Sequence, residues 1–188
     1  YTNSQYVAPN TVVCVAGNAS QIEAVRKVKK YFSSAAKAKP KKKPEVIERQ
    51  TAPELLLKFK ETDQTHLALG VRAYNLFHPQ KYVLEVLTVI LGGMMSSRLF
   101  TEIREKLGAA YYVRADADLN PDTGCLVAQA GVDNKKIDKV ISAILSEYKK
   151  ISQNKVSARE LKKAKENLKG KLALTLEASD ARASFFAG

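Results

Sequence analysis

Residues 92–113 constrain the fold more than any other part of the chain. Two glycines interrupt an apolar run, and residues 96–106 then carry apolar side chains at helical spacing. Gly108 follows, where a helix that ends in the left-handed conformation needs glycine. A strand-like run comes next. The segment therefore predicts a helix and a strand joined by a tight turn, with Arg104 near the helix end and Tyr111 near the strand start.

Apolar periodicity divides the rest of the chain into strands and helices. Strands are predicted at residues 11–16, 45–49, 55–61, 65–74, 109–119 and 125–132. Helices are predicted at residues 21–33, 79–91, 96–106, 137–151 and 158–170, the last continuing toward residue 186. Because residues 120–124 are turn formers, the strands around them are expected to form a hairpin. The pattern predicts an α+β fold, with one mostly antiparallel sheet and helices on one of its faces.

Several predicted helices begin with recognisable signals. Ser20–Glu23 and Ser157–Glu160 have the spacing of a capping box, in which each side chain bonds the other residue's backbone amide. Asp133 offers an N-cap to the helix at 137–151. Pro79 suits the first position of the helix that follows it. The inner face of that helix is predicted to hold Tyr82, Val83, Val86, Leu87, Ile90 and Leu91.

The chain has 188 residues, of which 45% are hydrophobic, so it can bury the core of one large domain or two small ones. Residues 37–44 combine lysines with two prolines and are predicted to be a linker. This linker separates residues 1–36, a strand and a helix, from the main domain at 45–188. Because the chain starts at Tyr1 and carries two unpartnered phenylalanines near its end, we expect a piece of a longer polypeptide.

The formal net charge is +12, and lysines concentrate in residues 26–30, 37–44 and 162–171. Such a surface can attract nucleic acid, anionic lipid or acidic peptides. No aromatic residues alternate with the lysines of residues 37–44, and no nucleic-acid-binding motif is present, so solvated linker and helix surfaces are the simpler interpretation. No apolar run approaches the roughly 20 residues of a membrane helix, and neither a membrane nor nucleic acid is an expected partner.

Residue types that perform catalysis do not assemble into a motif. Cys14 and Cys125 lie in separate apolar runs and are interpreted as buried free thiols, while a disulfide and the redox compartment stay open. His66 and His78 belong to no H-x-x-E-H or related metal-binding motif. No serine lies in G-x-S-x-G. The sequence therefore indicates no catalytic residue and no complete zinc site.

Because the chain carries no catalytic motif, the function left to consider is the binding of a ligand. Arg104 can donate a forked pair of hydrogen bonds to a carbonyl or carboxylate, and Tyr111 brings a hydroxyl on a rigid ring. Together they could clamp a peptide backbone. On a purely structural interpretation, Arg104 pairs with Glu102 or Glu105, and Tyr111 is half-buried packing. Spacing alone leaves both interpretations open.

Residues 92–113 resemble the signature of the insulinase family of zinc metallopeptidases, also called pitrilysin or mitochondrial-processing-peptidase-like. The shared pattern is Gly-Gly, Ser-Arg-Leu-Phe, Ile-Arg-Glu-Lys, a glycine, and Ala-Tyr followed by a valine. Residues 6–18, 66–74 and 121–124 fit the same family pattern. One departure is Ala109, where leucine is usual, and we expect this change to affect packing more than function.

The resemblance implies a fold and a cofactor. Members of the family are built from repeated α+β half-domains around a peptide chamber, similar to LuxS and processing-peptidase half-domains. One half-domain holds zinc through an H-x-x-E-H helix and a downstream glutamate, a region that would precede this chain. The resemblance implies that residues 1–36 are the last strand and helix of that preceding half-domain. Residues 45–188 would then be the substrate-clamping half-domain, truncated at its C-terminus. The resemblance therefore implies zinc in the full-length parent and none bound by this fragment.

The resemblance also assigns substrate-binding residues and partners. In the family, the following half-domain supplies an arginine and, seven residues later, a tyrosine that contact the substrate backbone. Arg104 and Tyr111 match these positions. Tyr112 is the second choice, because neighbouring strand residues point to opposite faces. The implied partners are a peptide substrate and the zinc-bearing half-domain of the same or a partner chain, with the parent a dimer.

The resulting interpretation is a fragment of a zinc-dependent endopeptidase that supplies the Arg104–Tyr111 pair and is inactive alone. The alternative within the same family is a non-catalytic core or scaffold subunit, whose upstream sequence would lack H-x-x-E-H. A basic nucleic-acid-binding module is the third interpretation.

Overall fold

The computed structural model describes all 188 residues of the chain. Their contacts divide the chain into two compact units. The first unit comprises residues 1–45 and 170–188, and the second unit comprises residues 46–169. None of the helices is long and apolar enough to cross a lipid bilayer.

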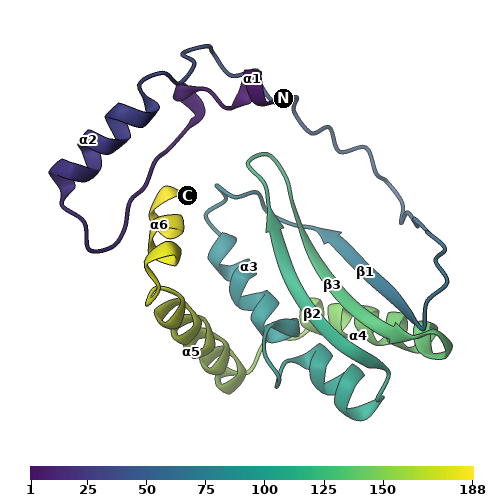
Figure 1. The fold of residues 1–188 in the computed structure, drawn as a ribbon. Coiled ribbons are helices and arrows are strands. Elements are labelled where there is room, and N and C mark those ends of the chain that lie inside the picture. The colour runs from purple at the N-terminus through teal and green to yellow at the C-terminus, as the bar shows by residue number, and fades with distance from the viewer. The chain divides into compact units, whose positions relative to one another are not determined.

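The second unit contains a three-stranded antiparallel sheet (Figure 1). Its strands are β1 (Gln64–Arg72), β2 (Ala110–Leu119) and β3 (Gly124–Asp133), with β3 in the centre. The hairpin predicted around residues 120–124 is confirmed, since β2 pairs with β3 across this turn. The strand predicted at residues 65–74 is confirmed as β1. Side chains alternate along each strand, so the sheet has one apolar face and one polar, open face.

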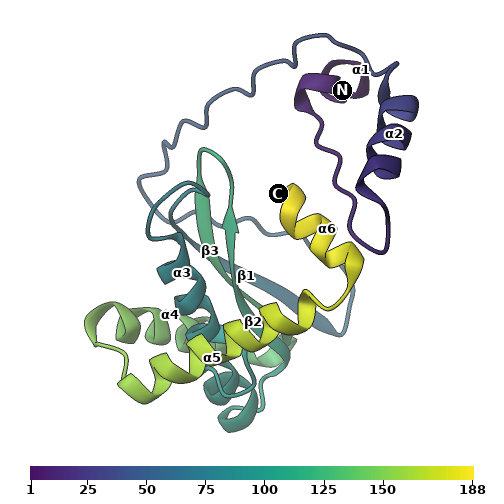
Figure 2. The ribbon, with the colours of Figure 1, turned by 90° about the vertical axis from the view of Figure 1, so that its left-hand side faces the viewer.

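Helical segments cover the apolar face of the sheet (Figure 2). They are α3 (Lys81–Thr88), η2 (Val89–Gly93), η3 (Phe100–Lys106), η4 (Asn134–Lys136) and α4 (Ile137–Gln153). Both η2 and η3 are π-helical, whereas η4 is a single 3₁₀ turn. The predicted α+β fold, with an antiparallel sheet and helices on one face, is confirmed.

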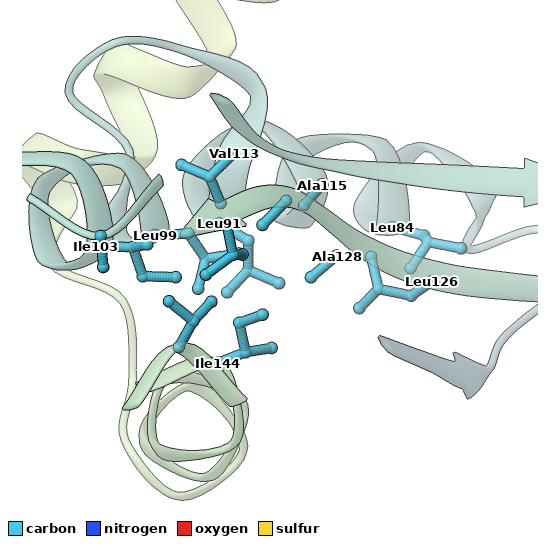
Figure 3. Close-up of a cluster of buried hydrophobic side chains, with 13 residues drawn as sticks. Leu84, Leu91, Leu99, Ile103, Val113, Ala115, Leu126, Ala128 and Ile144 are labelled. Carbon is cyan, nitrogen blue, oxygen red and sulfur yellow. The ribbon is translucent and has the colours of Figure 1, made fainter. Parts of the chain in front are cut away.

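The hydrophobic core lies between the sheet and these helical segments (Figure 3). Leu91, Leu99 and Ile103 are fully buried on one side, and Val140 and Ile144 of α4 complete the cluster. The strands contribute Val113, Ala115, Leu126, Ala128, Ala130 and Val132. Burial of each large aliphatic side chain contributes roughly 1.5–3 kcal/mol, so this cluster is what holds the helical segments on the sheet.

The backbone of η2 lies directly against β2 at Gly92. A Cβ added to Gly92 would overlap the backbone nitrogen of Ala115 and lie 2.7 Å from the carbonyl carbon of Arg114. Only glycine permits this approach, because the overlapped atoms belong to the backbone of a paired strand and cannot move aside. The glycine pair at 92–93 therefore does more than interrupt a helix, since it sets the distance between helix and sheet.

The helix α5 (Ala158–Thr175) begins in the second unit and is fastened there by an ion pair. Arg98 donates from Nε and Nη2 to the two carboxylate oxygens of Glu160, at 2.7 and 2.8 Å. Both side chains are partly buried. The hydrogen bonds from Arg98 lower the pKa of Glu160, and the same contact raises the pKa of Arg98. Beside this fork, Ala164 of α5 is fully buried against Val89 and Ile90.

Two side chains place α4 relative to the sheet. Asp133 accepts a hydrogen bond from the backbone nitrogen of Lys135 at 2.9 Å and so caps the 3₁₀ turn η4. The helix α4 itself begins after Lys136, which makes no side-chain capping bond, so the predicted cap of this helix is wrong. Near the other end, the hydroxyl of Tyr148 donates to the carbonyl oxygen of Leu69 in β1 at 3.0 Å. Burial raises the pKa of Tyr148 to about 12, so its hydroxyl stays protonated and remains a donor.

The first unit is helical. Its segments are α1 (Thr2–Gln5), η1 (Ala8–Asn10), α2 (Gln21–Phe32) and α6 (Ser179–Ala187). The helix predicted at residues 21–33 is confirmed as α2, although none of its residues is buried. A hollow of about 450 Å³ lies between α2 and the segment 13–19.

Three predicted strands are wrong. Residues 11–16, 45–49 and 55–61 form no strand and pair with no other segment of the chain. A strand is stable only when a neighbouring strand satisfies its backbone groups, and apolar composition alone does not provide that neighbour. The side chains of the third segment, including Leu56 and Phe59, are accordingly exposed.

Side chains, rather than a ladder of backbone hydrogen bonds, fasten residues 46–50 to the end of the sheet. Arg72 donates from Nη2 to the carbonyl oxygen of Gln50 at 2.7 Å, and its Nε lies 3.1 Å from Glu48 Oε2. The hydroxyl of Thr123 in the β2–β3 turn donates to Glu48 Oε1 at 3.1 Å. The segment thus reaches β1 and the hairpin turn without joining the sheet.

Neither predicted capping box forms completely. Ser20 is the N-cap of α2, but its side chain makes no capping hydrogen bond. The hydroxyl of Ser157 accepts from the backbone nitrogen of Glu160 at 3.2 Å, as predicted. The reciprocal bond is absent because the Glu160 carboxylate is held by Arg98 instead. A charge-assisted fork is stronger than a bond to a neutral amide, so the longer-range partner prevails.

The buried face of α3 also differs from the prediction. Tyr82 and Val83 are exposed, whereas Leu84 and Thr88 are buried. The helix begins at Lys81 rather than Pro79, and it lies on the sheet through residues spaced four apart. The predicted C-terminal helix is likewise interrupted at residues 176–178, which separate α5 from α6.

Replacing Gly92 by alanine is expected to destabilise the chain by about 1–3 kcal/mol, because the new methyl group overlaps the β2 backbone. The matched control is Gly170→Ala in α5, where an added Cβ meets nothing within 4 Å. Alanine is the better helix former there and should stabilise by roughly 0.5–1 kcal/mol. Urea unfolding of both variants measures the two changes. Equal effects in the same direction would contradict the proposed close contact.

Replacing Glu160 by glutamine should lower the free energy of unfolding by about 1.5–3 kcal/mol at neutral pH. The pKa of Glu160 is lowered in the folded chain, so its contribution is complete above its ordinary value of 4.5 and is lost as pH falls through the folded value. The difference between wild type and variant should therefore shrink below pH 4.5. Glu166→Gln, which removes an exposed pair with Lys169, is the control and should change stability by less than about 0.5 kcal/mol.

Candidate functional site

Arg104 lies on the exposed side of η3, one residue after the fully buried Ile103. Its guanidinium carbon stands 5.1 Å from the centre of the Phe100 ring, four residues earlier on the same segment. Stacking on an aromatic ring leaves the N–H groups at the edge of the guanidinium free to donate. A π-helical turn is rare and is frequently found at functional sites, which makes this segment a candidate site.

The carboxylates near Arg104 do not pair with it. Glu102 instead accepts a hydrogen bond from Lys106 at 2.8 Å, and this bond lowers the pKa of Glu102. The structure shows no ion pair between Arg104 and Glu102 or Glu105, so the structural alternative for Arg104 is wrong. Lys106 forms its ion pair with Glu102, four residues earlier on the same segment, and Arg104 remains an exposed donor.

A glycine turn connects η3 to β2. Gly108 has φ of +53°, which confirms the predicted left-handed residue. The backbone nitrogen of Ala109 then donates to the carbonyl oxygen of Ile103 at 3.0 Å, closing the wide last turn of the helix. Ala109 itself is buried in the core.

Tyr111 is the extra residue of a β-bulge. Ala110 pairs with Val132 and Tyr112 pairs with Gly131, so two consecutive residues of β3 face three of β2. Tyr111 is left without a cross-strand partner, and its side chain is 61% exposed. Bulges occur often next to active sites, where they redirect a side chain. The bulge also invalidates the argument that Tyr111 and Tyr112 must point to opposite faces, since strict alternation does not hold across it.

Tyr112 crosses the open face of the sheet. Its ring passes over Gly131 so closely that a Cβ there would lie 2.5 Å from the ring. Its hydroxyl lies 3.1 Å from Nδ1 of His66, the residue of β1 that pairs with Gly131. Sequence analysis missed this contact among three strands. An isolated glycine within a strand, such as Gly131, was the available signal of a close approach.

The open face beyond this contact is polar. Arg114 donates to Gln129 Oε1 from Nε at 3.1 Å and from Nη2 at 2.7 Å, and it also pairs with Asp116 at 3.3 Å. A hollow of about 570 Å³ lies beside His66, lined by residues 61–64. The polar side chains of this part of the open face are thus already paired with one another.

The structure brings Arg104 and Tyr111 to exposed positions on consecutive elements but joins them by no hydrogen bond or ring contact. Each is available to a ligand. No group of three or more histidine, cysteine, aspartate or glutamate side chains is arranged to hold a metal ion. Cys14 and Cys125 are free thiols of intermediate exposure, rather than the buried thiols predicted, and partial burial raises the pKa of Cys125. The residues of this chain therefore do not fit a zinc ion.

Solved structures that match this fold include a protease, a peptidase inactive domain and a chain of complex III2 from Candida albicans. A protease from Helicobacter pylori matches with a TM-score of 0.73 at 22% identity, over 92% of this chain and 43% of that chain. A peptidase M16 inactive domain from Pseudomonas fluorescens matches with a TM-score of 0.69 at 22% identity, over 84% of this chain and 38% of that chain. The fold is thus that of the α+β domains of M16-like peptidases.

Sequence comparison gives the family. The profile of the "Peptidase M16 inactive domain" matches residues 1–168. An uncharacterized zinc protease of Bacillus subtilis, YmxG, is 34% identical over 187 residues, which are 98% of this chain and 44% of that protein. An uncharacterized zinc protease of Mycobacterium leprae is 34% identical over 181 residues, or 94% of this chain and 40% of that protein. The chain belongs to the M16 peptidase family and corresponds to its inactive domain.

The chain spans less than half the length of these relatives. The family resemblance noted for residues 92–113 is confirmed by the match, which includes the whole of that segment.

Proposed function

We propose that this chain is the substrate-binding half of a zinc-dependent endopeptidase, and that Arg104 and Tyr111 bind the peptide backbone. The observation that carries the proposal is the state of Arg104. It is an exposed guanidinium on a π-helical turn, it stacks on Phe100, and it has no carboxylate partner. An unneutralised donor held in a fixed place is suited to bind an acceptor from outside the chain.

Arg104 supplies the positive end of the proposed clamp. The Phe100 ring restrains one face of the guanidinium, so less side-chain freedom is lost when a ligand binds. The free edge donates two parallel hydrogen bonds to a peptide carbonyl or to the terminal carboxylate of a product. In this role Arg104 orients the substrate and takes no part in proton transfer.

Tyr111 supplies a neutral donor. As the unpaired residue of the bulge, it can project its hydroxyl without breaking a ladder hydrogen bond. A phenol hydroxyl can donate to a backbone carbonyl or to negative charge that develops on it. The seven-residue spacing between Arg104 and Tyr111 matches the family's substrate-binding pair.

The zinc and its ligands would belong to the other half of the enzyme, because the residues of this chain do not fit a metal ion. When bound there, zinc supplies Lewis-acid chemistry, whereas this chain binds and orients the peptide. The proposed partners are therefore a peptide and the zinc-bearing half, in the same polypeptide or in a partner subunit of a dimeric parent. A fragment limited to this chain should have no peptidase activity.

The competing proposal is a non-catalytic core subunit of the same family. A core subunit needs the helix-on-sheet packing but has no use for an unpaired Arg104 or for a bulge at Tyr111. The basic nucleic-acid-binding interpretation gains nothing from these two residues either. The exposed donors therefore favour the peptidase role.

The test uses the parent protein with both halves present and a pool of internally quenched fluorescent decapeptides. Arg104→Ala and Tyr111→Phe should each lower kcat/KM by at least about tenfold, because each removes a hydrogen bond to the reacting peptide region. Thermal unfolding of both variants should match wild type, since neither side chain is buried.

Arg159→Ala and Tyr82→Phe are the matched controls, as both residues are exposed and belong to elements other than η3 and β2. Their kcat/KM should stay within about twofold of wild type. Unchanged kcat/KM in both clamp variants, or a parent that cleaves no peptide of the pool, would refute the proposed function.

A further inference from the structure

Tyr111 and Tyr112 of β2 are both near Gly131 of β3, but only one of them can pair with it. Ala110 pairs with Val132, and Val113 pairs with Ala130, so only Gly131 remains opposite Tyr111 and Tyr112. One of the two tyrosines must pair with Gly131, and the other must be the extra residue of the bulge. Either choice keeps Val113 in the core, and the hydrophobic pattern therefore does not decide between them.

The contacts on the open face favour one choice. With Tyr112 opposite Gly131, its ring fits over the glycine, where any side chain would collide with it. The Tyr112 hydroxyl then reaches Nδ1 of His66 at 3.1 Å. The His66 and Tyr112 rings also stack, with centroids 6.0 Å apart and planes inclined by 30°. These contacts span all three strands and exist only when Tyr111 is the unpaired residue.

We propose that His66 and Tyr112 are positioning residues that fix the bulge at Tyr111 and so direct its hydroxyl to the substrate. This inference rests on the proposed substrate-binding role of Tyr111. Gly131 leaves room for the ring, and His66 holds its far end. Without them the bulge can move one residue along β2, and Tyr111 would then turn over Gly131, away from the peptide.

An exposed location distinguishes this contact from ordinary core packing. Tyr112 is 37% exposed and His66 is exposed, so the hydrogen bond between them buries little apolar surface. A cross-strand pair of this kind stabilises a sheet only modestly. Its main effect is to select one arrangement of two similar residues, which agrees with a positioning role.

The first experiment is a double-mutant cycle in the full-length parent, assayed with the pool of internally quenched decapeptides. Tyr112→Phe keeps the ring but removes the hydroxyl, and it should lower kcat/KM about two- to tenfold, the factor that one neutral hydrogen bond is worth. In a Tyr111→Phe background the same change should have an effect of less than about twofold, since the group being positioned is already gone. His66→Leu should behave as Tyr112→Phe does, and His66→Asn should restore part of the loss.

Additive effects of Tyr111→Phe and Tyr112→Phe would overturn the inference, because they would mean that Tyr112 acts independently of Tyr111. An unchanged kcat/KM in Tyr112→Phe would overturn it as well. If Tyr111→Phe alone has no effect, the proposed function fails, and the second experiment decides the positioning of Tyr111 separately.

The second experiment observes the bulge directly and needs no activity. 3-Fluorotyrosine is placed at position 111 of the parent protein, and its fluorine resonance is recorded by NMR. A single narrow resonance is expected in the wild-type background. Gly131→Ala and Tyr112→Phe should each split or broaden it, because Tyr111 then exchanges between two positions. One unchanged narrow resonance in both variants would overturn the inference whatever the kinetics show.

Discussion

The contact between the η2 backbone and β2 at Gly92 determines how everything after it is placed. Because no side chain separates the two backbones there, the chain leaves η2 close to the sheet surface. Leu99 and Ile103 can then reach the core, and Arg98 can reach Glu160 of α5. A wider spacing would leave these residues short of their partners. The packing of η3 therefore depends on the absence of a side chain at Gly92.

The proposed binding residues lie immediately beside residues that cannot move. Ile103 is fully buried and Arg104 is exposed, and on β2 the buried Val113 follows Tyr112. An error in the position of a buried side chain costs packing energy, so its neighbour on the surface is held within narrow limits. Core packing therefore also determines where the donors on the surface lie. A site that binds a ligand but has no catalytic residues needs donors held in fixed positions.

Local signals in the sequence predicted the parts of the fold that depend on neighbouring residues. The turn at 120–124 and the left-handed Gly108 are decided within a few residues, and both were predicted correctly. Strands at 11–16 and 55–61 failed because a strand needs a partner that composition does not reveal. The Arg98–Glu160 pair joins residues 62 apart, and the bulge depends on the register of β3, so neither leaves a local signal.

Charge alone would not have identified the candidate site. In a chain with a net charge of +12, many cations lack a carboxylate partner, and an unpaired arginine is unremarkable by itself. Arg104 differs because a ring and a π-helical turn restrain it, whereas a lysine in a linker keeps its full side-chain freedom. The same reasoning applies to Tyr111, one of eight tyrosines, which is set apart by the bulge. In both residues, the fold already restricts the conformation before a ligand binds. Less conformational entropy is therefore lost when the ligand binds.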